Sequence, residues 1–374
     1  MSIKSYTRMT RIDTCTKVFK FKLKSPLPAK ATVLKSTKNK IQLYKLFVEN
    51  LTNPLTAPST LNHKLVVCGE NPTPIEINNN IANPRVEMTT SHEEADVIVV
   101  QQAMKAILYG EYNEAKVLSD DSDVFALLIF WYNRTGITAP VYMESPKHST
   151  KTCVDIKQSA LGCVDIVGNI LQVHAITGCD TVNSFYGIGK PTALAAARTG
   201  EYLLTELGSL NASINDVITE GTKFISACYG HPSTDMTDCR KTVWHKKTSN
   251  DTVVKAPELQ SLPPTSDSFQ YHMLRAHAQA IVWMSTMDAH PPYFDPLHFG
   301  WEVDSSRTFL LPKISTQGVQ MAPEYSLKLI KCGCKANEPC KTGRCSCHHA
   351  ALGCTVFCAC YGKNCHNPHT PTMI

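Results

Sequence analysis

The chain lacks any apolar run long enough to cross a bilayer, and its N-terminus lacks the continuous apolar core of a secretory signal peptide. Its 374 residues, 43% hydrophobic and 18% charged, have an ordinary globular composition and enough length for two domains. We therefore expect an intracellular protein in a reducing compartment, with no membrane partner. The basic, acid-poor N-terminus leaves a mitochondrial address open.

Acidic residues are scarce at the start of the chain. Residues 1–50 contain twelve Lys or Arg but only Asp13 and Glu49 as acids, so their net charge is +10. Because the whole chain sums to +5, the remaining residues sum to −5. This asymmetry is typical of contact with a polyanion such as nucleic acid, although a solvated basic arm explains it equally well. We treat 1–50 as a basic N-terminal segment.

Residues 51–229 alternate between strand and helix patterns. This order predicts an α/β domain with a mostly parallel sheet flanked by helices. Ser91 and Glu94 match a capping box that would begin one helix, and the Asn- and Pro-rich segment 71–84 is typical of a loop. The predicted strands are 64–69, 115–118, 141–143 and 152–156, and the predicted helices are 91–108, 124–132, 164–177, 191–198 and 216–229. A further helix, 38–51, is predicted at the end of the basic segment.

Three further segments follow the α/β region. Residues 230–267 are polar and contain several prolines, and we expect a linker or long loop there. Residues 268–287 show helical periodicity, so we expect 268–325 to hold one helix and an irregular connection that packs on the core. Residues 328–367 are expected to form a small irregular cysteine module.

Nine of the sixteen cysteines lie between positions 332 and 365, and they include three C-x-C pairs. The other seven are scattered and are typical of buried or free thiols. Zinc takes four soft ligands in a tetrahedron, and nine thiolates fill the positions around three ions if three of them bridge. The predicted zinc ligands are Cys332, Cys334, Cys340, Cys345, Cys347, Cys354, Cys358, Cys360 and Cys365.

Other uses of these cysteines fit the sequence less well. A disulfide framework would need an oxidising compartment and would leave one cysteine over. An iron–sulfur site would use about four of the nine. Two zinc ions held by eight thiolates remain an alternative, as does substitution by a histidine. The nearby histidines are His348, His349, His366 and His369.

The run KCGCKANEPCKTGRCSCHHAALGCTVFCACYGKNCHN resembles the CXC module of tesmin-like, cysteine-rich chromatin proteins. The resemblance implies three zinc ions on nine cysteines and a module that binds DNA. The last cysteine interval is longer here than in that family, and Arg344 stands where the family has a tyrosine that enters the minor groove. Arg344 and Lys341 are the expected contacts to nucleic acid. A purely structural role for the module remains the alternative.

Acidic residues gather at three places where predicted strands meet helices. Several converging carboxylates can hold two magnesium or manganese ions for phosphodiester hydrolysis, whereas acids at helix starts also serve as caps. The three groups are Glu93, Glu94 and Asp96; Asp120, Asp121 and Asp123; and Asp180.

These clusters, in the runs HEEADVIVVQQAMKAI, VLSDDSDVFALL and ITGCDTVNSFYGIGKPTALAA, resemble the motif order of flap-endonuclease-type PIN nucleases. The resemblance implies a PIN-like fold and a divalent-metal site. It assigns metal binding to Glu94, Asp96, Asp121, Asp123 and Asp180, and duplex phosphate binding to Gly187, Gly189 and Lys190. That family has a metal-contacting aspartate on its first strand. In this chain Asp13 is the one acidic residue before Glu49, and it is not in a strand-like context. This implies an incomplete metal site, a fragment or short isoform, or a fold kept as a scaffold.

The arrangement as a whole also resembles uncharacterised transposon-associated proteins of invertebrates, through YHMLRAHAQAIVW and GWE ahead of the cysteine run. Two functions therefore compete. One is a nuclear, DNA- or chromatin-binding protein with a PIN-like domain and a zinc module. The other is an active, structure-specific DNA endonuclease that depends on magnesium or manganese. The sequence predicts DNA as a partner and no particular protein partner.

Overall fold

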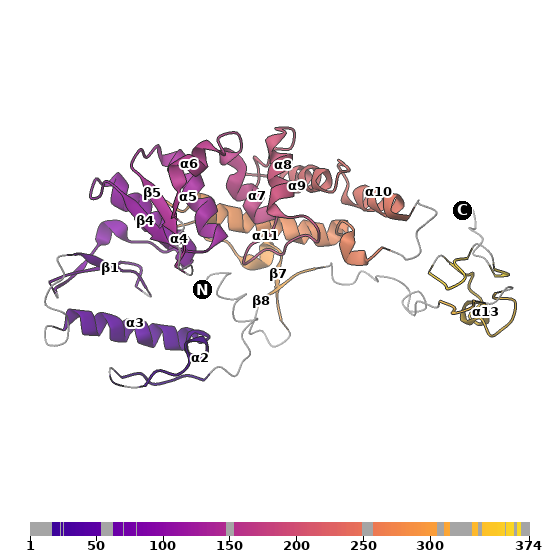
Figure 1. The fold of residues 1–374 in the computed structure, drawn as a ribbon, viewed down its shortest axis with the longest axis horizontal. Helices are drawn as coiled ribbons and strands as arrows, with labels where there is room; N and C mark the ends of the chain where they lie inside the picture. The colour runs from indigo at the N-terminus through magenta and orange to yellow at the C-terminus, as the bar shows by residue number, and fades with distance from the viewer. Residues whose placement is uncertain are drawn as a thin grey trace. The chain divides into compact units, whose positions relative to one another are not determined.

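The computed structural model describes residues 17–22, 24, 26–53, 63–69, 71–79, 81–146, 153–248, 257–304, 310–314, 331–335, 339–355, 357–362 and 365–367. The protein is mixed α/β and divides into two compact units. Unit 1 comprises Met1–Cys239 and Thr265–Ile314, and unit 2 comprises Arg240–Pro264 and Ser315–Ile374 (Figure 1). The first sixteen residues, including Asp13, lie outside the described part. No helix in the described ranges is long and apolar enough to cross a membrane.

Unit 1 begins with two helices and a small antiparallel sheet. Helix α2 spans Lys30–Leu34 and α3 spans Thr37–Thr52. The sheet has the order β1-β2-β3, formed by Leu65–Val67, Ile75–Asn78 and Ile81–Pro84. The last two strands lie inside segment 71–84, so the prediction of a loop there is wrong. Ile77 is fully buried, and this single core anchor outweighs the turn-forming Asn and Pro residues around it.

The second sheet carries the acidic turn. Strand β4 (Ala115–Leu118) pairs in parallel with β5 (Val141–Glu144), and β5 pairs antiparallel with β6 (Cys153–Asp155). Helix α5 (Ser122–Thr135) connects the parallel pair and is capped at its end by Gly136 with φ 67°. One parallel strand pair occurs in the described residues, so the expected mostly parallel sheet is not confirmed.

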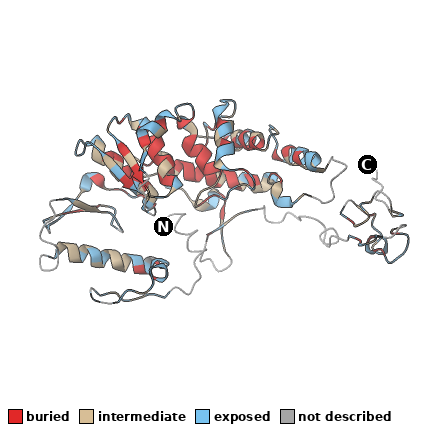
Figure 2. Ribbon diagram, in the orientation of Figure 1, coloured by how far each residue is buried: buried red, intermediate tan, exposed pale blue. Residues whose placement is uncertain are grey.

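Helices make up most of unit 1. Helix α11 (Ser266–Met284) packs against α7 (Ile170–Ile176) and α9 (Ile214–Cys228), and its buried residues occur on all sides. Figure 2 shows buried positions concentrated in these helices and in α5. The remaining α-helices of this part are α4 (Ala95–Leu108), α6 (Ile156–Leu161) and α8 (Lys190–Arg198), and the 3-10 turns are Val86–Met88, Val167–Asn169 and Pro296–His298.

Two predicted helix starts were wrong. The helix expected from residue 91 begins at Ala95, with Glu94 at its N-cap and no side-chain cap, so the predicted capping box does not form. The helix expected over 164–177 is α-helical only from Ile170. Residues 288–325 were expected to be irregular, but they contain the antiparallel strands β7 (Trp301–Val303) and β8 (Leu310–Pro312), which fix the buried Trp301.

Unit 2 contains most of a helix that the sequence analysis missed. Helix α10 spans Met236–Thr248, within the segment 230–267 that was expected to be a linker or loop. Its apolar stripe is only Met236, Cys239 and Val243, too few to stand out against its polar residues. A 3-10 turn at Leu259–Ser261, the cysteine module and the short helix α13 (Ser346–His349) complete the described part of this unit.

Candidate metal centre and acidic pocket

The nine cysteines of the module gather into one cluster. Six of them are at most 4% exposed, and Cys334, Cys360 and Cys365 pack against those six. Sulfur–sulfur distances from Cys332 are 3.4 Å to Cys340, 3.7 Å to Cys360 and 3.8 Å to Cys354. Four thiolates at about 2.3 Å around one zinc ion lie about 3.8 Å apart in a tetrahedron. The spacing therefore fits sulfurs that share a metal ion.

The cluster resolves into three groups of four sulfurs, each group within 4.8 Å. Cys332 belongs to all three groups, and Cys340 and Cys354 each belong to two. The groups are Cys332, Cys334, Cys340 and Cys345; Cys332, Cys347, Cys354 and Cys358; and Cys332, Cys340, Cys354 and Cys360. These groups consist only of sulfurs and are largely buried, and they can hold zinc or another thiophilic metal ion.

Disulfides and histidine ligands find no support among the described residues. Every described cysteine is a free thiol, and the 3.4–3.8 Å sulfur spacings far exceed a disulfide bond of about 2.05 Å. His348 and His349 are exposed and belong to none of the sulfur groups. His369 lies outside the described residues.

The module's backbone folds tightly around the sulfurs. Cys340, Ala351 and Tyr361 have positive φ values of 70°, 54° and 54°, which cost free energy in residues that carry a side chain. Gly362 also has a positive φ, of 67°, and a Cβ there would lie 2.7 Å from the carbonyl oxygen of Cys354. A conformation of this kind needs strong compensating interactions, and a bound metal cluster would supply them.

Electrostatics of the thiols also favour a bound cation. Burial raises the pKa of the Cys347 thiol to about 12 and raises the pKa of Cys340 and Cys354 further. Burial acts the same way on Cys345, but the His348 amide and neighbouring thiols donate to its sulfur and bring its pKa to about 7. Converting nine adjacent thiols to thiolates requires compensating positive charge, which metal ions provide.

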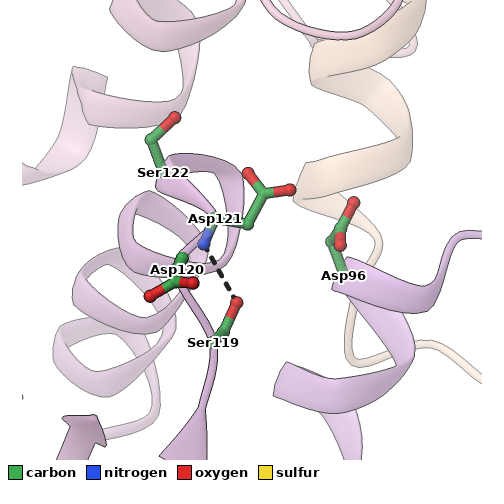
Figure 3. A pocket seen from close by; sticks show the side chains of 5 residues that line it. All are labelled: Asp96, Ser119, Asp120, Asp121 and Ser122. Carbon is green, nitrogen blue, oxygen red and sulfur yellow. Dashed lines mark hydrogen bonds between the residues drawn. The ribbon is translucent and has the colours of Figure 1, made fainter. Parts of the chain in front are cut away.

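A second candidate site is an open, polar pocket of about 480 Å³ in unit 1. It lies between the first turn of α4 and the turn that joins β4 to α5, and it is lined by Asp96, Ser119, Asp120, Asp121 and Ser122. In Figure 3 the carboxylates of Asp96 and Asp121 point toward each other across the pocket. Asp121 caps α5 by accepting from the amide of Asp123 at 2.9 Å, while Asp120 accepts from the hydroxyl of Ser145.

A buried hydrogen-bond chain connects two of the acidic groups. The amide nitrogen of Gln279 donates to both carboxylate oxygens of Glu94, at 3.1 and 3.4 Å, and its amide oxygen accepts from Thr181 at 2.5 Å. Glu94 is only 6% exposed. Because Thr181 follows Asp180, this chain holds the loop of Asp180 beside the start of α4.

Asp123 faces the core instead of the pocket. It is 6% exposed, and its carboxylate lies 2.8 Å from Nε2 of the buried His174. Of the five carboxylates predicted as metal ligands, two line the pocket (Asp96 and Asp121), two are buried and hydrogen-bonded (Glu94 and Asp123), and that of Asp180 is half-buried. Within the described ranges, the groups of three or more ligand atoms inside 4.8 Å consist of cysteines, and the carboxylates form none.

The predicted phosphate-binding turn lies at the start of α8. Gly187 is exposed with φ 76°, and Gly189 is the N-cap of α8. Lys190 has a different environment from the one expected. Its ammonium donates to the carbonyl oxygens of His174 and Gly178 and to the Thr177 hydroxyl, at 2.6–2.9 Å, and burial lowers its pKa to about 8. It thereby caps the C-terminal end of α7.

The remaining predicted nucleic-acid contacts, Lys341 and Arg344, are exposed on the module. Sequence reasoning did not identify Gln279, Thr181 or His174 as parts of the acidic region. No residue near Gln279 in the sequence indicates that its side chain contacts Glu94, which lies 185 positions earlier in the chain.

No family model, curated protein or solved structure matches the chain. Function is therefore argued from the geometry and chemistry of these sites.

Proposed function

We propose that the module binds three zinc ions in a nine-thiolate cluster. The observation that carries this proposal is that three groups of four sulfurs share three members, Cys332, Cys340 and Cys354. Nine thiolates fill the positions around three tetrahedral ions only if three of them bridge. The number of shared cysteines equals the number of bridges that the chemistry requires.

Cys365 packs against the cluster but belongs to none of the three sulfur groups, and we propose it as the ninth ligand. Backbone hydrogen bonds hold the chain around Cys365 next to two of the shared cysteines. The amide of His366 donates to the carbonyl of Pro339, which precedes Cys340, and the amide of Cys354 donates to the carbonyl of Asn367 at 2.6 Å. In the zinc-loaded module we expect Cys365 to take the place that Cys332 has in the group of Cys360, so that each pair of ions shares one cysteine. The proposed sets are Cys332, Cys334, Cys340 and Cys345; Cys332, Cys347, Cys354 and Cys358; and Cys340, Cys354, Cys360 and Cys365.

Metal analysis and native mass spectrometry of the zinc-loaded chain test this arrangement. We expect three zinc ions per chain. Cys340→Ser removes a bridge, so it should cost two zinc ions, whereas the matched change Cys334→Ser removes a terminal ligand and should cost at most one. Equal losses in the two variants, or a wild-type chain with two zinc ions, would contradict the shared-ligand ring.

We further propose that the zinc module is a DNA-binding element and that the protein acts in the nucleus. Residues 328–365 contain six Lys or Arg and one acid, and three zinc ions with nine thiolates sum to −3, so the module carries about +2. Exposed Lys335, Lys341 and Arg344 supply cations for phosphate oxygens. The modest charge favours contact with the DNA backbone over strong sequence readout.

Binding of duplex DNA by the full-length chain, followed by fluorescence anisotropy, tests this role. We expect salt-sensitive binding that is lost on zinc removal and weakened by Lys335→Gln with Arg344→Gln. Binding that persists undiminished in both cases would exclude the module as the DNA contact.

A second candidate function, phosphodiester cleavage with magnesium or manganese, is favoured by the acidic pocket. Asp96 and Asp121 face one space, and Gln279 connects Glu94 to the loop of Asp180. Oxygen ligands of this kind suit Mg²⁺ or Mn²⁺. Gly187, Gly189 and the amides that open α8 would hold phosphate. The Lys190 ammonium would not, because it already has three acceptors.

Incubation of the purified chain with flap and hairpin DNA plus Mn²⁺ tests this candidate. Cleavage should disappear in Asp121→Ala and Asp180→Ala and persist in Asp216→Ala, a matched exposed acid on α9. If the wild-type chain binds DNA but does not cut it, or if the two variants cut it normally, the nuclease role is excluded and the DNA-binding role stands.

A further inference from the structure

Helix α10 belongs largely to the unit that contains the cysteine module. Unit 2 takes in the helix from Arg240 onward together with the C-terminal segment. The ring of Trp244 on this helix lies 6.2 Å from that of Phe357 on the module, centroid to centroid. Phe357 is still 48% exposed, so the contact covers only part of its ring.

The charged residues of α10 lie away from its apolar stripe. Met236, Cys239 and Val243 are buried, whereas Lys241, His245 and Lys246 are exposed. Arg240 and Lys247 hydrogen-bond to the carbonyls of Pro263 and Ser261, which fixes the turn after the helix against it. The exposed part of the helix is therefore a positively charged surface held within unit 2.

The charge of unit 2 comes mainly from this helix. Residues 240–264 contain five Lys or Arg and two acids, for a net charge of +3, and residues 315–374 contain six and two, for +4. Three zinc ions with nine thiolates reduce the second value by three, to +1. Without α10, the zinc-loaded unit would be almost neutral and would attract a polyanion only weakly.

We propose that α10 contacts the same duplex DNA backbone as the zinc module, so that the two elements of unit 2 form one DNA-binding surface. The proposal rests on the proposed DNA binding of the module. The evidence for α10 as a DNA contact is charge complementarity with the phosphate backbone, because most of the excess positive charge of the zinc-loaded unit lies on this helix.

The test uses the full-length, zinc-loaded chain and a duplex DNA, titrated over a range of salt concentrations. Lys241→Gln with Lys246→Gln should weaken binding by about tenfold at moderate salt and lower the salt slope by about one per lysine. The matched control is Lys157→Gln with Lys223→Gln, two exposed lysines of unit 1, which should change neither. Zinc content and circular dichroism confirm that each variant is folded.

A third variant, Lys335→Gln with Arg344→Gln, separates the two proposals. If it weakens binding while the α10 variant binds like wild type, the inference about α10 fails and the module remains a DNA contact. If wild-type protein does not bind duplex DNA, both proposals fail. If the α10 variant binds duplex RNA of the same sequence more weakly than wild type but binds duplex DNA normally, the assignment of α10 to DNA is also overturned.

Discussion

Gln279 uses both ends of its amide to connect parts of the chain that are distant in sequence. Its nitrogen donates to Glu94 and its oxygen accepts from Thr181, and all three side chains are buried. A buried carboxylate needs donors to compensate for lost hydration. One glutamine therefore stabilises the start of α4 and fixes the loop that carries Asp180.

Replacing Gln279 with leucine should lower the free energy of unfolding by about 2–3 kcal/mol, because the buried Glu94 carboxylate loses this donor and Thr181 loses its acceptor. Urea denaturation followed by tryptophan fluorescence measures the change. Gln158→Leu, on the exposed face of α6, should shift stability by less than about 0.5 kcal/mol. Similar effects in the two variants would show that the hydrogen-bond chain contributes little.

At the scale of elements, the turn into β7 depends on a glycine. Gly300 has φ 83°, and a Cβ at this position would lie 2.6 Å from the carbonyl oxygen of Tyr271 on α11. The guanidinium of Arg275 donates to the carbonyls of Gly300 and Lys313 at 2.8 Å, which fastens both strands of the hairpin to α11. The backbone at Gly300 therefore packs directly against the backbone of α11, with no room for a side chain between them.

Gly300→Ala should destabilise unit 1 by more than about 2 kcal/mol, since the added methyl group meets a carbonyl oxygen in a conformation that L-residues disfavour. Thermal unfolding measures the loss. Gly168→Ala is the matched control, because nothing lies within 4 Å of its Cβ position and its φ is not positive. A Gly300→Ala protein with wild-type stability would mean that the hairpin docks differently.

The sequence predicts elements where the signal is local. β4 was predicted with the bounds that the structure has, and the spacing of the nine cysteines predicted a compact cluster. The strands of segment 71–84 and helix α10 were missed because each has only a few buried anchors among polar residues. The contact of Gln279 with Glu94 could not be predicted from the sequence, because it depends on how α11 packs against the start of α4. The metals, the DNA and the role of the carboxylates stay predictions.

For the molecule as a whole, two buried histidines on α11 make unit 1 sensitive to acid. Burial lowers the pKa of His272 and His277 from 6.5 to about 4. Nδ1 of His277 accepts from the amide of Gly208, and protonation would break that bond. The unfolded chain has the ordinary histidine pKa of 6.5, so between pH 6.5 and 4 it binds protons that the folded chain does not. The free energy of unfolding therefore falls as the pH drops from about 6.5 to 4.

We expect this effect to remove about 3 kcal/mol per histidine across that window. Urea denaturation at neutral and mildly acidic pH, followed by tryptophan fluorescence, measures it. His277→Gln should reduce the pH dependence by about half, since His272 remains, even if it lowers stability at neutral pH. The exposed His298→Gln should leave the pH dependence unchanged. Stability that is constant between pH 6.5 and 4 would contradict buried, neutral histidines.

Unit 1 is assembled from two stretches of chain separated by residues 240–264. Its central helix, α11, comes from the second stretch, and Trp131 donates to the carbonyl of Trp283 at the end of that helix. On the ribosome, residues 1–239 therefore emerge before the helix that fills their core. They can complete unit 1 only after about fifty further residues, through the end of α11, have been synthesised and have left the exit tunnel. A transcript that ends before α11 would encode a chain with exposed apolar surface, a substrate for chaperones and proteolysis.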